Sequence, residues 1–167
     1  MTWDESADSL IISGDLDVND GTIKLDGNYP VGTNNVALGD AALDSLTSGQ
    51  RNVAVGTDAL TAVTSGQRNT AVGYIALTNA TGSYNAAFGE QALQGTTTGQ
   101  YNTAIGTAAA ANNTEGSNNT AVGASALLNN TTASENTAVG YQAAYSITGS
   151  QYNTAIGRGA LYSHTTG

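Results

Sequence analysis

The chain has 167 residues, and Ala, Thr, Gly and Asn together make up more than half of it, whereas 10% of residues are charged and 6% are aromatic. It contains no cysteine, which excludes disulfides and cysteine-based metal or redox sites. The net charge of −9 argues against nucleic-acid binding, and no apolar run approaches the ~20 residues of a membrane-spanning helix, so we expect neither a nucleic-acid partner nor membrane insertion.

The first 31 residues form a distinct, acidic module. The apolar run at 10–12 precedes residues 13–18, which alternate at period two, as residues 22–25 do again, and the Asn-Asp-Gly sequence at 19–21 is a strong turn signal. This pattern predicts a β-hairpin. Pro30 then interrupts it, because proline is poorly tolerated in a central strand. We therefore place a hairpin module and junction at residues 1–31, followed by a second domain at 32–167.

The acidic residues of this module have two possible interpretations, a calcium site or a solvated acidic surface. Asp15, Asp17 and Asn19 are spaced like the first ligands of an EF-hand loop, and Asp26 stands at its twelfth position. The loop requires glycine at its sixth position, where Asp20 stands, and no flanking helices are predicted. The acidic surface is favoured, and we expect no metal site.

From residue 32 onward the chain is an internal repeat. Eight copies of Asn-x-Ala-x-Gly-x-x-Ala occur at a spacing of 17 residues, apart from one step of 16 between Asn69 and Asn85. Such a fixed period indicates a repeat architecture. The repeat asparagines are Asn35, Asn52, Asn69, Asn85, Asn102, Asn119, Asn136 and Asn153. The repeat glycines are Gly39, Gly56, Gly73, Gly89, Gly106, Gly123, Gly140 and Gly157.

The repeat unit predicts β-structure. Its Gly, Thr and Asn content disfavours helix, and the sequence Asn-Thr-Ala-Val-Gly alternates as a short strand does. Stacking the units would place like residues above like at about 4.8 Å, so the Asn and Thr columns could form hydrogen-bonded ladders. We predict an all-β parallel β-roll, a β-solenoid with one 17-residue repeat per coil.

One alanine column suggests an interface between copies. The residue two after the repeat Asn is always Ala, and it points away from the larger apolar residue that follows it, which we take as the solenoid interior. A closely approaching neighbour would demand such small residues, and cyclic symmetry is the simplest arrangement. The alternative is that Ala is a low-cost filler in a recent duplication. The candidate interface residues are Ala37, Ala54, Ala71, Ala87, Ala104, Ala121, Ala138 and Ala155.

The repeat resembles that of two groups of fibrous proteins. Residues 69–73 (Asn-Thr-Ala-Val-Gly) and 102–106 (Asn-Thr-Ala-Ile-Gly) resemble the Asn-Ser-Val-Ala-Ile-Gly head repeats of YadA-like trimeric autotransporter adhesins. That resemblance covers residues 35–167 and implies a trimeric, left-handed parallel β-roll that binds host surfaces or matrix proteins. The longer form, with Asn-Thr-Ala-Val-Gly-Tyr-Gln-Ala at 136–143 and Thr-Gly-Ser-Tyr-Asn at 81–85, is similar to repeats of phage tail-fibre proteins.

Catalysis is poorly supported by the sequence. The only histidine is His164, in a column otherwise filled by residues of many types, which we interpret as a variable surface or turn position. No pair of acids recurs in the repeat, as carbohydrate-cleaving solenoids would require. We therefore expect no enzyme activity, no catalytic residues and no cofactor.

A variable column of large residues is a candidate recognition surface. The residue just before each repeat Asn is mostly Tyr or Arg, the types that dominate contact hot spots. The alternative is that these are simply bulky residues at an exposed turn. The candidate recognition residues are Arg51, Arg68, Tyr84, Tyr101 and Tyr152.

These features together predict a non-enzymatic structural or adhesive fibre segment, a homotrimer that displays a surface for a host protein or glycan. The favoured context is a phage tail fibre or similar virion protein, and the runner-up is the head domain of a bacterial surface adhesin. An ice-binding solenoid is less favoured, because the column after the Asn is Thr in only five copies. The last repeat stops part-way, so we expect a piece of a longer fibre.

Overall fold

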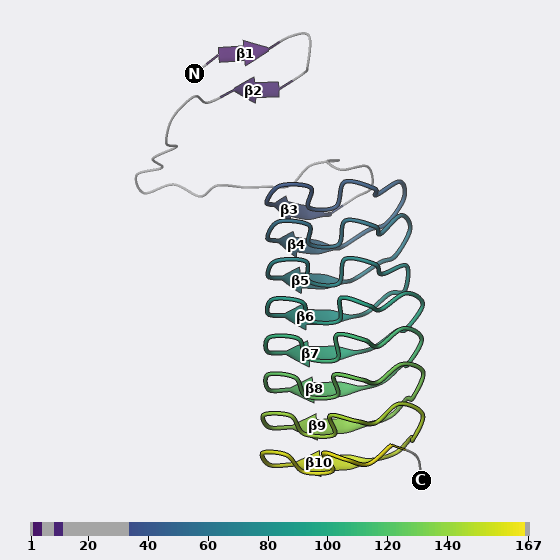
Figure 1. The fold of residues 1–167 in the computed structure, drawn as a ribbon. Helices are drawn as coiled ribbons and strands as arrows, with labels where there is room; N and C mark the ends of the chain where they lie inside the picture. The colour runs from purple at the N-terminus through teal and green to yellow at the C-terminus, as the bar shows by residue number, and fades with distance from the viewer. Residues whose placement is uncertain (1, 5–8, 12–33, 166–167) are drawn as a thin grey trace.

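The computed structural model describes residues 2–4, 9–11 and 34–165, all of which are in strands, turns or extended segments (Figure 1). Near the N-terminus, β1 (Thr2–Asp4) pairs antiparallel with β2 (Ser9–Ile11), with Trp3 opposite Leu10. The remainder of the hairpin predicted at 10–25, the junction and the boundary after residue 31 lie outside the described residues.

Residues 34–165 form a β-solenoid, which confirms the predicted all-β repeat fold. Eight three-residue strands stack in chain order into one parallel sheet, so that β3 lies at one end and β10 at the other (Figure 1). In this sheet the repeat alanines pair with one another from coil to coil. The strands are β3 (Val36–Leu38), β4 (Val53–Val55), β5 (Thr70–Val72), β6 (Ala86–Phe88), β7 (Thr103–Ile105), β8 (Thr120–Val122), β9 (Thr137–Val139) and β10 (Thr154–Ile156). The left-handed winding and the trimer stay predictions.

We number the coils from the residue before each repeat Asn: 34–50, 51–67, 68–83, 84–100, 101–117, 118–134, 135–151 and 152–165. Coil 3 is one residue shorter than the others, yet its strand keeps the common register, with Ala71 opposite Ala87. The Thr81 N–H still donates to the Thr97 carbonyl, and the Tyr84 N–H still donates to the carbonyl of Gln67, the last residue of coil 2. The missing residue therefore falls in the corner between Thr81 and Tyr84.

The alanine column lies inside the coil, which corrects the predicted orientation of the strand. Ala71 and Ala104 are 0% exposed, whereas the larger apolar residues that follow the column point outward, with Ile156 70% exposed. The strand wall packs against a second wall that carries the repeat's other Ala and its Leu, such as Ala109 and Leu127, so the strand contributes only Ala to an interior whose larger side chains come from elsewhere in the coil. The interface predicted for Ala37, Ala54, Ala71, Ala87, Ala104, Ala121, Ala138 and Ala155 is therefore wrong.

A ladder of buried asparagines closes each coil and joins it to the next, as the sequence predicted. The Asn102 side-chain amide donates to the Gly116 carbonyl 14 residues on, at 2.8 Å, and its Oδ1 accepts the backbone N–H of Asn119 at 2.9 Å. Equivalent bonds recur from Asn35 to Asn136. Only a neutral side chain with both a donor and an acceptor can make this pair of bonds.

Threonine and glycine columns complete the stacking. The Thr97 hydroxyl donates to the Thr114 carbonyl at 3.0 Å, and Thr114 donates likewise to Thr131 at 2.9 Å. The repeat glycines allow adjacent backbones to approach closely: a Cβ on Gly106, whose φ is 129°, would lie 2.7 Å from the Gly123 carbonyl carbon. This is a place where only glycine fits.

Candidate interaction surface

The outer side of the parallel sheet is an uncharged surface with one continuous apolar row beside a row rich in Thr, here called the strand face. It carries the first and third residues of every strand, and Phe88 and Ile105 at its centre are 41% and 45% exposed. Parallel pairing repeats these side chains about every 4.7–4.9 Å along the solenoid. The strand face comprises Val36, Val53, Thr70, Ala86, Thr103, Thr120, Thr137 and Thr154 in one row, and Leu38, Val55, Val72, Phe88, Ile105, Val122, Val139 and Ile156 in the other.

The sequence prediction did not identify this surface, because it placed the larger residues of the strand inside the coil. Alternation does establish that Thr103 and Ile105 share one side and that Ala104 faces the other. Within the strand, the signal that identifies the inside is invariance: the inward Ala is the same in every coil, and the two outward positions vary in size. Large exposed apolar strips of this kind mark interaction sites.

The predicted recognition column, here called the Arg/Tyr stripe, runs along one edge of the strand face. All of its residues are exposed and have left-handed backbone conformation, for example Arg51 at φ 59° and Tyr101 at φ 57°. The left-handed conformation turns the chain into the strand and leaves the side chain of the stripe residue outside the coil. The stripe comprises Asn34, Arg51, Arg68, Tyr84, Tyr101, Asn118, Glu135 and Tyr152.

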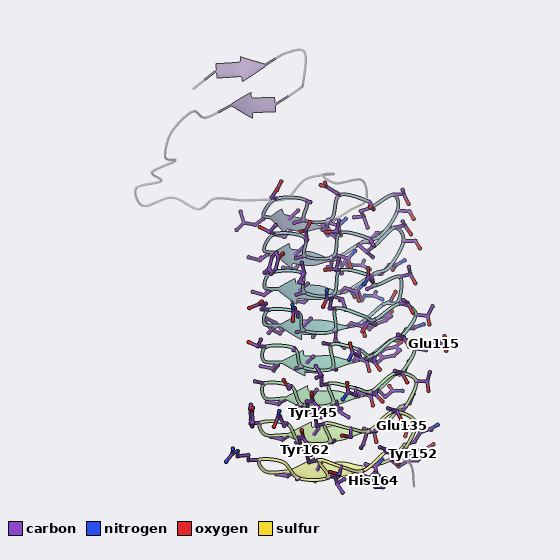
Figure 2. The ribbon with its side chains drawn as sticks, in the orientation of Figure 1. Glu115, Glu135, Tyr145, Tyr152, Tyr162 and His164 are labelled. Atoms are coloured by element: carbon purple, nitrogen blue, oxygen red, sulfur yellow. The ribbon has the colours of Figure 1, made fainter. Side chains whose placement is uncertain are left out.

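The structure brings three of the five candidate recognition residues into contact. The Arg68 guanidinium lies 5.1 Å from the centre of the Tyr84 ring and donates to the Tyr84 hydroxyl. Tyr84 and Tyr101 stack with ring centres 4.7 Å apart and planes 13° from parallel. Arg51 continues this run in the neighbouring coil, whereas Tyr152 lies on coil 8, beyond Asn118 and Glu135 (Figure 2).

The opposite edge of the strand face carries a second exposed column, which the sequence reasoning did not single out. Its residues directly follow the repeat glycines, and we call it the second margin. The Arg158 guanidinium on this margin lies 5.7 Å from the centre of the Tyr141 ring. The second margin comprises Asp40, Thr57, Tyr74, Glu90, Thr107, Ala124, Tyr141 and Arg158.

His164 lies in an interior column and not in a surface column, which corrects its predicted position. Its equivalents in the other coils are buried, including Leu46, Val63 and Ile147. His164 itself is half-buried in coil 8, where its Nε2 lies 3.3 Å from the Ser150 hydroxyl (Figure 2). Tight packing within each coil, and not solvent, surrounds this column.

No cluster of three or more His, Asp or Glu side chains able to hold a metal ion occurs among residues 2–4, 9–11 and 34–165. The same residues include no helix of the length and apolarity needed to cross a membrane.

Comparison with protein-family models, curated proteins and solved structures finds no match to this chain.

Proposed function

We propose that this chain is a non-enzymatic segment of a fibre, assembled as a homotrimer through its strand face, in a phage tail fibre or similar virion protein on which it contributes a surface for host attachment. The observation that supports assembly is the row of outward apolar side chains that runs without interruption through all eight strands. Burying such side chains stabilises association by roughly 25 cal/mol per Å² of apolar area removed from water.

A second copy of the same chain suits this face better than an unrelated partner. The face repeats with the period of the coil, so a parallel copy presents the same rows at the same spacing. Its residues are uncharged in every strand from β3 to β10, and self-association therefore buries no ionised group at the centre of the contact.

Substitution of Phe88 by Lys tests this function directly. We expect Phe88→Lys to convert the oligomer to a monomer with the same far-UV circular dichroism, because the charge enters the contact while the coil interior is untouched. Thr98→Lys is the matched control, since Thr98 is exposed on another side of the same coil. Light scattering measures both. A Phe88→Lys protein that keeps the wild-type mass would contradict assembly through the strand face.

Attachment through the Arg/Tyr stripe is the second part of the proposal. Tyr84 and Tyr101 hold each other in a stacked pair, which lowers the entropy lost when a ligand immobilises them. We expect Tyr84→Ser, Tyr101→Ser and Tyr152→Ser together to reduce binding to host cells or a glycan array at least tenfold, with the mass in solution measured on the same sample. Attachment of this variant at the wild-type level would show that the stripe does not mediate host attachment.

The same arrangement fits the head domain of a bacterial surface adhesin, which is the alternative context. The two contexts differ in what the complete gene encodes: an adhesin carries an outer-membrane anchor, and a virion protein carries phage attachment modules. Sequencing the gene and its neighbours separates them without a change to the assembly proposal.

One observation favours an ice-binding role as a further candidate. Thr103, Thr120, Thr137 and Thr154 point outward on four successive coils, beside a row of Val and Ile. Such a role needs the strand face open to water, whereas assembly covers it. Microscopy of ice crystals grown with the Phe88→Lys monomer and with the wild-type protein tests for ice binding. Faceted crystals with either protein would support it.

A further inference from the structure

Charged residues gather along the two borders of the strand face. Every arginine of the chain lies on the Arg/Tyr stripe or on the second margin. Both borders are exposed, and each contains residues of both signs. The charged residues on these borders are Arg51, Arg68 and Glu135 on the stripe, and Asp40, Glu90 and Arg158 on the second margin. The other charged residues of 34–165 are Asp44, Asp58 and Glu115.

Coil by coil, the two borders are complementary. Arg68 on coil 3 of the stripe corresponds to Tyr74 on the same coil of the second margin and to Glu90 on the next. Glu135 on coil 7 corresponds to Tyr141 and then to Arg158. Guanidinium groups pair favourably both with carboxylates and with aromatic faces, so Arg68 is attracted to both of its counterparts and Glu135 is attracted to Arg158.

Arg51 follows the same rule. It stands on coil 2, between Asp40 of coil 1 and Tyr74 of coil 3 on the second margin. Each charge on the stripe thus meets an opposite charge within one coil, and none meets a like charge at that distance. Within a single chain the charged groups of the two borders do not pair with one another. Arg68 contacts Tyr84 along its own stripe, and the described residues form no ion pair across the strand face.

We propose that copies of this chain assemble parallel and in register, with the Arg/Tyr stripe of one copy against the second margin of the next. The proposal rests on the proposed self-association and specifies its geometry. A contact between two different edges is heterologous, and three copies close it into a ring around the strand faces. An antiparallel pair would instead place the Glu90 side chains of the two copies one coil apart, which is repulsive.

This arrangement assigns the stripe to the seam between copies and competes with its attachment role. The two roles are measured separately, because seam variants change the mass in solution and attachment variants change binding at constant mass. The apolar rows would supply the affinity, and the borders would fix register and direction, as charged rims do in other interfaces.

Cross-linking tests the geometry in a chain that has no cysteine of its own. In the variant carrying Tyr101→Cys and Thr107→Cys, the thiols lie on opposite borders of coil 5, outside each other's reach within one chain. With a short bis-maleimide we expect covalent trimers from the double variant and only monomers from Tyr101→Cys alone. Cross-linked dimers from the single variant would overturn the parallel arrangement. So would an assembled double variant that yields no covalent product.

Charge exchange gives an independent measurement. We expect Glu135→Arg alone and Arg158→Glu alone each to weaken self-association about tenfold, and the variant with both changes to recover wild-type assembly. Two single variants that assemble as wild type, or a double variant no better than the singles, would overturn the pairing of the borders. A wild-type monomer at every concentration would instead refute the proposed self-association itself, so the two failures are distinguishable.

Discussion

At the scale of single residues, the asparagine column both closes each coil and binds it to the next. Asn102 reaches the Gly116 carbonyl across its own coil and accepts from Asn119 in the following one, and it is 1% exposed. No water can replace these bonds at that burial, so the cost of losing them is that of leaving buried polar groups without partners.

Asn102→Leu is the substitution that measures this cost. It replaces the amide by an apolar side chain of similar size, leaves the Asn119 N–H unpaired, and removes one of the two donors to the Gly116 carbonyl, which Asn113 still bonds at 2.9 Å. We expect the free energy of unfolding to fall by about 1–3 kcal/mol. Asn112→Leu is the control, because Asn112 is exposed and its amide only bonds the Asn129 side chain at 3.2 Å. Urea denaturation followed by circular dichroism measures both. Equal losses at the two positions would contradict the ladder's role.

Thr96 shows the opposite situation, a buried polar group without a partner. Its hydroxyl is 0% exposed and makes no hydrogen bond. Thr96→Val removes the hydroxyl while keeping the shape, and we expect it to raise the free energy of unfolding by about 1 kcal/mol. In the control, Thr97→Val, the bond to the Thr114 carbonyl is lost and stability should fall by a similar amount. A lower melting temperature for Thr96→Val would show that the hydroxyl is satisfied in solution.

At the scale of the element, the coil tolerates length changes at one corner and nowhere in the strand. Coil 3 omits a residue between Thr81 and Tyr84 without a shift in strand register. Gly82 keeps the glycine position whose carbonyl accepts from Asn69, so a Ser inserted between Thr81 and Gly82 restores the common length, and we expect it to change the free energy of unfolding by less than about 1 kcal/mol. A Gln inserted between Ala87 and Phe88 reverses the facing of the residues after it and should abolish the cooperative transition. Similar melting curves for the two insertions would contradict this view of the coil.

Much of this element could be predicted from the repeat alone. The period gave the length of the coil, and the invariant Asn and Thr columns predicted the ladders seen at Asn102 and Thr97. The direction in which Ala71 and Val72 point could not be predicted by alternation, which places them on opposite sides without naming the inside. The left-handed corners were also hidden, because residues such as Arg68 and Ile75 occupy them in place of glycine.

At the scale of the whole molecule, the thin interior and the apolar exterior have one explanation. Ala, Asn and Leu fill most of the interior, whereas the strands point their larger β-branched and aromatic residues outward. Such a surface is expected in a protein that packs against copies of itself, with the charged borders directing the copies. The recognition stripe predicted from sequence is exposed, and its role is decided by whether attachment and assembly depend on the same residues.

The mass of the chain in solution tests the central claim most directly. Light scattering over a range of concentrations should give about 50 kDa, three times the 16.7 kDa of one chain. A mass of 16.7 kDa at every concentration, in a sample whose circular dichroism shows the full β-structure, would contradict assembly through the strand face.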